Sequence, residues 1–206
     1  MRSALATVAI LVATVGCVPM AASPGYIGPD HIRTAETKSR LQYRGFSVSP
    51  PVGRDWWVTV SEQNSAHAIF RRELSSSTHT FFAGVNLVQL DAKLPFEVAA
   101  RQDHIADVSR FQMQEYQQQP DGSRPGKCLR YSSRTVDTKA PNSAGVSLQL
   151  LMRGFVCAHP SMENTAVTAY YSERGLPSEL DPSLWNDLDN YLRGVQLESA
   201  PGVPAS

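Results

Sequence analysis

Two cysteines lie at equal distances from the centre of a predicted β-hairpin, and this symmetry restricts the fold more than any other feature of the sequence. Residues 127–138 and 146–158 are rich in β-branched, aromatic and apolar side chains, which are typical of strands. Residues 140–145 between them contain the proline, asparagine, serine and glycine of a turn. A hairpin folded about the middle of this turn places Cys128 directly opposite Cys157.

The same register predicts a disulfide between neighbouring strands. Cys128 and Cys157 enclose a segment of 30 residues, for which a cross-link stabilises the folded state by about 3.6 kcal/mol in the chain-entropy model. A redox or metal-binding pair is the alternative, but the chain has no Cys-x-x-Cys motif, and His159 is the one histidine close in sequence to either cysteine. We therefore expect a structural disulfide.

The third cysteine follows an N-terminal segment with the pattern of an export signal. Arg2 provides a positive charge, and residues 4–15 contain neither a charge nor a proline. Twelve such residues extend about 18 Å as a helix, which is short of the ~30 Å hydrocarbon core of a bilayer. The segment is therefore predicted to direct export rather than to form a permanent transmembrane anchor.

The residues at the end of this segment, Thr-Val-Gly-Cys ending at Cys17, resemble the cleavage site of bacterial lipoproteins. In that family small residues precede a cysteine that is diacylated before cleavage, and leucine is preferred where this chain has threonine. The resemblance implies a signal peptide over residues 1–16 and acyl chains on Cys17 that attach the protein to the membrane of the cell envelope. Because Val18 rather than aspartate follows, it also implies the outer membrane, facing the periplasm, in a Gram-negative host. The alternative is cleavage near Ser23, which would give a soluble exported protein.

Positive and negative charges balance in this chain. There are 19 lysines and arginines against 19 aspartates and glutamates, so the formal net charge is zero. A chain without a positive field lacks the attraction that nucleic-acid-binding proteins use. We therefore expect no nucleic-acid partner and a membrane contact that depends on the lipid at Cys17.

The mature chain is predicted to contain one folded domain between two irregular ends. Residues 17–40 contain several prolines and glycines and are expected to form the lipidated N-terminus and a flexible tether. Residues 41–197 are long enough for one domain with its own core. Residues 198–206 are expected to be a disordered tail.

Strand patterns outnumber helix patterns within the domain. Strands are predicted over residues 45–49, 56–60, 66–74, 78–90, 127–138, 146–158 and 165–171. Two helices are predicted, one over residues 94–118 and one that begins at Asp181 and Pro182. Apolar residues recur at helical spacing in the second helix, at Leu184, Trp185, Leu188, Tyr191, Leu192 and Val195. This order favours an α+β fold with a mainly antiparallel sheet of about six or seven strands and two helices.

The order of these elements resembles a group of exported α-β-α sandwich domains that includes the extrinsic photosystem II protein PsbP. The likeness rests on the strand at Gly45-Phe46-Ser47-Val48, the prolines and tryptophans after it, and then strands, a helix, a three-strand meander and a closing helix. It covers residues 45–197. The resemblance implies a binding or assembly-accessory module without a shared active site, so it assigns no catalytic residue.

One acidic cluster with a histidine has helical spacing. Asp103, His104 and Asp107 would lie on one side of the predicted helix over residues 94–118. Such a cluster can serve as a metal site or a general base, although the same residue types are common on solvated helix faces. Glutamines crowd the end of the same predicted helix, where they either bind polar ligands through their amides or lie in solvent. They are Gln112, Gln114, Gln117, Gln118 and Gln119.

Adjacent tryptophans provide the best candidate for a binding surface. Because neighbouring strand residues point to opposite faces, Trp56 and Trp57 cannot both enter the same core. One ring is therefore either a platform for a peptide or carbohydrate or is covered by the N-terminal segment. His67 and His79 lie on neighbouring predicted strands, but the turn at residues 75–77 places them out of register, so they are not expected to share a ligand.

The sequence contains none of four common catalytic or nucleotide-binding motifs. These are Gly-x-Ser-x-Gly, Gly-x-x-x-x-Gly-Lys-[Ser/Thr], Gly-x-Gly-x-x-Gly and His-Glu-x-x-His. We therefore predict a non-enzymatic lipoprotein that binds a protein or another component of the cell envelope, with no cofactor, no metal and no catalytic residue. The alternative is a periplasmic hydrolase or metal-dependent enzyme that uses Asp103, His104 and Asp107.

Overall fold

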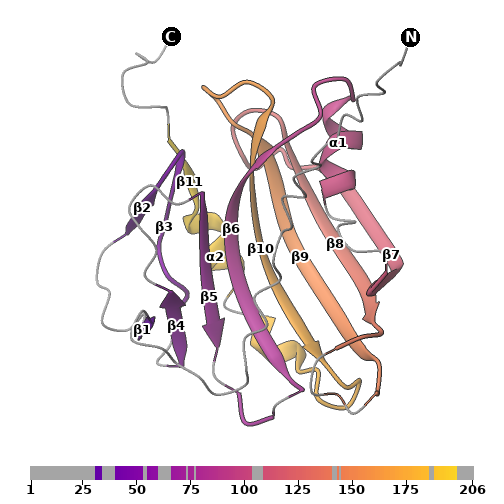
Figure 1. Cartoon of the computed structure of the whole chain (residues 1–206). Helices are drawn as coiled ribbons and strands as arrows, with labels where there is room; N and C mark the ends of the chain where they lie inside the picture. The colour runs from indigo at the N-terminus through magenta and orange to yellow at the C-terminus, as the bar shows by residue number, and fades with distance from the viewer. Residues whose placement is uncertain are drawn as a thin grey trace, which may run out of the picture.

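Antiparallel strands form the centre of the molecule (Figure 1). The computed structural model describes residues 31–33, 40–52, 55–59, 66–72, 74–76, 78–103, 109–140, 143, 145–185 and 188–198. In this part of the chain, eight strands form one sheet in the order β1-β4-β5-β6-β10-β9-β8-β7. Their bounds are β1 His31–Arg33, β4 Trp56–Thr59, β5 His67–Arg72, β6 Thr80–Gln89, β7 Phe111–Pro120, β8 Cys128–Asp137, β9 Leu148–Ala158 and β10 Thr165–Gly175.

All neighbouring strands in this sheet are antiparallel, which confirms the predicted α+β fold. Seven of the eight strands belong to residues 41–197. The eighth, β1, lies within residues 17–40, the segment expected to be a tether, and pairs with β4. A smaller sheet has the order β11-β3-β2. Its strands are β2 Leu41–Tyr43, β3 Phe46–Val48 and β11 Gln196–Leu197.

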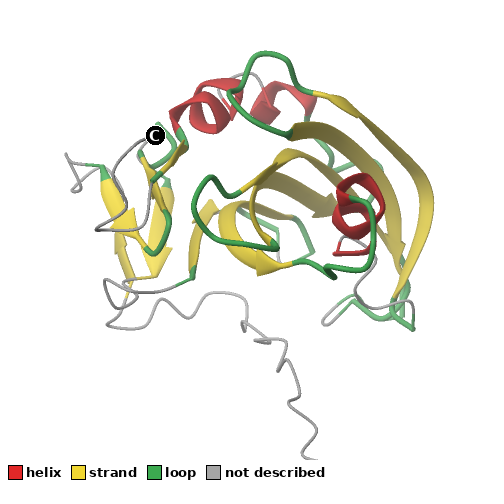
Figure 2. Cartoon of the chain, turned by 90° about the horizontal axis from the view of Figure 1, so that it is seen from above, coloured by secondary structure: helices red, strands yellow, loops and turns green. Residues whose placement is uncertain are grey.

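The two α-helices cover opposite faces of the large sheet, which is curved when seen from above (Figures 1 and 2). Helix α1, Phe96–Asp103, packs its buried Ala100 with Leu129 and Val156. Helix α2, Leu188–Gly194, packs on the other face together with the smaller sheet. The main core lies on this second face and contains buried aromatic and aliphatic side chains from strands far apart in sequence. Its largest fully buried members are Phe46, Phe70, Phe81, Phe155 and Tyr171.

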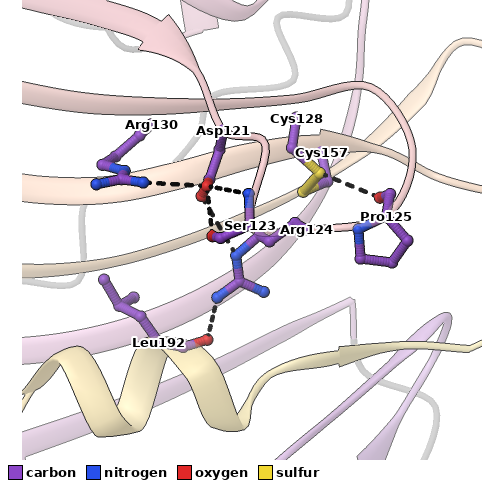
Figure 3. The surroundings of a disulfide bond; sticks show 8 residues. All are labelled: Asp121, Ser123, Arg124, Pro125, Cys128, Arg130, Cys157 and Leu192. Atoms are coloured by element: carbon purple, nitrogen blue, oxygen red, sulfur yellow. Dashed lines mark hydrogen bonds and ion pairs between the residues drawn. A yellow bond between two sulfur atoms is a disulfide. The ribbon is translucent and has the colours of Figure 1, made fainter.

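The predicted hairpin register is confirmed. Cys128 pairs with Cys157, and Leu129 pairs with Val156 in the β8–β9 ladder. The two cysteines form a disulfide, with an S–S distance of 2.05 Å, close to the loop that joins β7 to β8 (Figure 3). The strands on both sides of the turn therefore have the pairing that their sequence symmetry requires.

The closing helix begins as predicted and has two parts in the described residues. A 3₁₀ helix, η2, covers Pro182–Trp185, and α2 follows. The Asp181 carboxylate accepts a hydrogen bond from the Ser183 backbone N–H at 2.9 Å, as expected of an N-cap. All six apolar residues of the predicted stripe contact the main core.

The prediction of one helix over residues 94–118 is wrong. Helix α1 ends at Asp103, and residues 111–120 form β7 at the edge of the sheet. Side chains Phe111 and Met113 are partly buried, and then the register with β8 shifts between Met113 and Glu115, so that Tyr116 is the next partly buried side chain. This β-bulge adds one residue to the period of two and produces a spacing that resembles a helix.

The described residues include no helix that is long and apolar enough to cross a membrane. The predicted signal peptide, Cys17 and Ser23 all lie outside the described residues. The same is true of the predicted tail beyond residue 198.

Removal of the Tyr191 hydroxyl is expected to stabilise the protein. The side chain is buried, its ring lies 5.8 Å from the Phe70 ring, and its hydroxyl has no hydrogen-bond partner in the described part of the chain. Because an unpaired buried hydroxyl costs free energy, Tyr191→Phe should raise the free energy of unfolding by about 1 kcal/mol, measured by urea denaturation. Tyr116→Phe is the matched control, since the Tyr116 hydroxyl donates a hydrogen bond to Oε1 of Gln118 at 2.9 Å, and should lower it. An equal loss in both variants would contradict the expectation.

Candidate functional site

The structure does not place the predicted acidic cluster. His104 and Asp107 lie outside the described residues, and of Asp103 only the backbone at the end of α1 lies within them. Among the described residues, no group of three or more histidine, cysteine, aspartate or glutamate side chains could hold a metal ion. The side chains that the structure does bring together lie on the face of the sheet that carries α2.

The two tryptophans of β4 take opposite faces, as their adjacency predicts. Trp56 is only 3% exposed and its ring lies 5.7 Å from that of Phe81 in the main core. It therefore cannot belong to an exposed binding surface, which corrects the candidate surface inferred from the sequence. Trp57 is half-buried.

The two histidines singled out in the sequence lie apart, as expected. His67 is exposed on β5 and pairs in register with Asn86 of β6. His79 precedes β6, and its Nε2 lies 2.8 Å from Oε1 of the buried Glu173 on β10. His79 thus belongs to a different set of contacts, one that supports the site described next.

A groove of about 410 Å³ lies between strands β7 to β10 and the segment that contains η2. This volume is in the range that takes small ligands. Its polar lining is formed by Glu115, Gln117, Ser132, Ser133, Arg134, Arg153, Tyr171, Glu173 and Asp189. Its apolar lining is formed by Leu151, Met152, Leu180, Pro182 and Trp185. The groove therefore has charged and apolar sides within reach of one ligand.

Glu173 holds the η2 segment against the sheet. Its carboxylate is completely buried and accepts hydrogen bonds from the Trp185 indole Nε1 at 2.5 Å and the Asp181 backbone N–H at 2.8 Å. The His79 ring lies at hydrogen-bond distance from the same carboxylate. A buried carboxylate with three such partners fixes the position of Trp185, and with it the apolar wall of the groove.

The floor of the groove is a row of side chains on four neighbouring strands. Gln117 of β7 pairs with Ser132 of β8, which pairs with Arg153 of β9, which pairs with Tyr171 of β10. Tyr171 is buried where the row meets the core, and burial, followed by the nearby Asp189 carboxylate, raises the pKa of its hydroxyl. The row passes from apolar core at β10 to open polar surface at β7.

Arg153 is exposed at the centre of this floor, although it lies on an inner strand of the sheet. Its guanidinium carbon lies 5.1 Å from the centre of the Trp185 ring, a distance typical of a cation–π contact. Tyr171 lies directly beside it in register on β10. The contact with Trp185 orients the guanidinium across the groove between η2 and β9.

The loop between β7 and β8 closes the adjoining part of this face (Figure 3). Arg124 donates a hydrogen bond to the Leu192 carbonyl of α2 at 2.5 Å, and its guanidinium carbon lies 3.5 Å from the centre of the Phe155 ring. Burial lowers the pKa of Arg124, although the Asp121 carboxylate opposes this change. Asp121 also pairs with Arg130, at 3.1 Å. These contacts hold the start of β8 in place beside the disulfide, and they position α2.

Neither Arg153 nor the groove was predicted from the sequence. One signal for Arg153 is present in the sequence, because a charged residue within the apolar strand Leu148–Ala158 requires either a buried partner or an opening above the sheet. The wall of the groove has no such signal. Trp185 appears in the sequence only as part of an apolar stripe that packs in the core.

The comparisons with known proteins give a distant structural match. No family model matches the chain, and no curated protein matches it. A point mutant of the protein Mog1 matches with a TM-score of 0.47 and 10% identity, over 78% of this chain and 96% of that one. The Saccharomyces cerevisiae Ran-binding protein Mog1p matches with a TM-score of 0.47 and 10% identity, over 75% and 91% of the two chains. Mog1 shares the PsbP-like fold, but a match this distant neither assigns the chain to that group nor implies a shared function.

Proposed function

We propose that this protein is an exported lipoprotein of the cell envelope whose domain binds a partner in the groove between β7–β10 and η2, without catalysing a reaction. The groove carries this proposal. It combines an exposed arginine on an inner strand with an apolar wall that a fully buried carboxylate holds in place. Exposed polar groups beside a rigid apolar wall are the usual composition of a recognition site.

Two further observations support the proposed location in the cell envelope. The Cys128–Cys157 disulfide is of the kind that persists in oxidising compartments such as the periplasm. The N-terminal segment resembles an export signal followed by the lipidated Cys17 of lipoproteins. Two or more acyl chains on one cysteine would hold the protein on the membrane, since each buried methylene contributes about 0.8 kcal/mol.

Photo-crosslinking in intact cells tests the proposal. A photoreactive amino acid at Gln117, on the exposed rim of the groove, should capture a recurrent species in the membrane fraction. The matched control is the same amino acid at Val98, which is 43% exposed on α1 across the sheet and should capture no such species. Cys17→Ser should move the protein to the soluble fraction.

Each part of this experiment can fail separately. Equal products from both positions, or none from Gln117, would contradict a binding function for the groove. A protein that stays in the membrane fraction after Cys17→Ser would contradict anchoring through the lipid.

A further inference from the structure

We infer that the groove binds the carboxylate group of a ligand on Arg153 and packs an apolar part of the same ligand against Trp185. This inference rests on the proposed binding function and specifies the chemistry of the ligand. Two kinds of molecule carry this chemistry, namely a small organic acid and the C-terminal residue of a peptide. Both place an acceptor-only group beside an apolar body.

Arg153 is available for a carboxylate, whereas the other arginines of strands β8 to β10 are already paired. Arg130 and Arg174 each lie 3.1 Å from an aspartate oxygen, and Arg134 lies 3.8 Å from Glu115. Within the part of the chain that the structure describes, Arg153 has no carboxylate within 4 Å. Its planar guanidinium, held over the ring of Trp185, matches the two oxygens of a carboxylate.

Neighbouring donors extend the same site. Ser132 lies beside Arg153 in register and Gln117 lies one strand further, so a hydroxyl and an amide adjoin the guanidinium. Both side chains can donate hydrogen bonds, and a carboxylate accepts as many as four. A ligand carboxylate at Arg153 would therefore find further donors toward β7.

None of the three described carboxylates that line the groove forms an ion pair with Arg153. Glu173 is buried and has three partners, and Glu115 pairs with Arg134. Asp189 lies near the Tyr171 hydroxyl. Arg153 is thus the charged group of the groove that a ligand of opposite charge can neutralise.

The wall opposite Arg153 selects for an apolar body. Leu180, Pro182 and Trp185 line this side, and Leu151 of β9 also lines the groove. Contact with these side chains removes apolar ligand surface from water, which favours binding. A ligand with both parts should therefore bind more tightly than acetate, which has the carboxylate alone.

Binding of simple probes to the purified full-length chain tests the inference. The chain contains three tryptophans, and only Trp185 lines the groove, so the indole N–H signals of Trp56 and Trp57 serve as internal controls in NMR titrations. Phenylacetate should shift the Trp185 signal in a saturable way. Phenylacetamide, 2-phenylethylammonium and acetate should bind at least about tenfold more weakly, because each lacks the carboxylate or the apolar body.

Variants identify the residue that binds. Arg153→Gln should weaken phenylacetate binding at least about tenfold, and Arg153→Lys should restore part of it, because lysine keeps the charge without the planar fork. The matched control, Arg101→Gln, removes a guanidinium that lies over Tyr116 across the sheet and should leave binding unchanged. Unchanged Trp56 and Trp57 signals in all three variants would show that the fold is retained.

The outcomes separate this inference from the proposed function. Equal binding of phenylacetamide, tighter binding of the ammonium probe, unchanged binding by Arg153→Gln, or no response to any probe would overturn the carboxylate site. Crosslinking from Gln117 would still decide whether the groove binds a partner. Gly-Gly-Phe with a free or an amidated C-terminus then distinguishes the sources, since tighter binding of the free peptide than of phenylacetate indicates a chain terminus and the reverse indicates a small acid.

Discussion

Replacement of Asp137 by asparagine should lower the free energy of unfolding by about 3–5 kcal/mol, because the change leaves two arginines without their counter-charge. The Asp137 side chain is fully buried at the end of β8. Arg110 donates two hydrogen bonds to its carboxylate, at 2.8 and 2.7 Å, and Arg174 donates one at 3.1 Å. Urea denaturation of Asp137→Asn and of the unaltered chain at pH 7 measures the difference.

A carboxylate on the neighbouring strand provides the control for Asp137. Glu115 pairs with Arg134 at 3.8 Å, but both side chains are exposed, so Glu115→Gln should cost about 1 kcal/mol or less. If the two variants lost similar amounts of unfolding free energy, the buried cluster would contribute no more to stability than an exposed ion pair.

The pH dependence of stability provides a second readout for Asp137. Burial alone would raise the pKa of this carboxyl, but the hydrogen bond from Arg110 and the charges of Arg110 and Arg174 outweigh burial and lower it. Because the folded-state pKa lies below the unfolded value of about 3.9, the stabilisation is complete above that pH and is lost as the pH falls through the folded-state pKa. Asp137→Asn should therefore lose less stability between pH 5 and pH 2 than the unaltered chain.

Removal of the disulfide is the other change with a large expected effect. Simultaneous Cys128→Ser and Cys157→Ser replacement should lower the free energy of unfolding by about 2–4 kcal/mol, because the unfolded chain regains the freedom of the segment between the cysteines. The bond joins residues 29 apart in sequence and lies near the loop that positions α2. Thermal unfolding with and without a reductant measures this effect.

The double variant is its own control for the reductant. The reductant should lower the unfolding temperature of the unaltered chain to that of the double variant and should leave the variant unchanged. A reductant that lowers both equally would show that the effect does not come from this bond.

The β8–β9 hairpin could be predicted in detail because its information is local. Turn residues lie midway between two strand patterns, and the equal spacing of the cysteines defines the register that the structure confirms from Cys128 with Cys157 to Asp137 with Leu148. The start of the closing helix was predictable for the same reason, since an N-cap and a first-turn proline act on the next few residues. The strand β7 was not, because one bulged residue after Met113 changes the apparent period.

The sequence alone determined the antiparallel α+β fold, the disulfide and the apolar stripe of the closing helix, because turn residues, periodicity and caps act over a few positions. Only the tertiary structure decided which side chains form the groove. Gln117, Ser132, Arg153 and Tyr171 come from four strands, and their row depends on three strand registers at once. The tertiary structure also decided that Trp185 forms a wall, because the buried Glu173 carboxylate of β10 fixes the indole of this η2 residue. Such contacts depend on how strands and helix pack together, and no local pattern in the sequence specifies that packing.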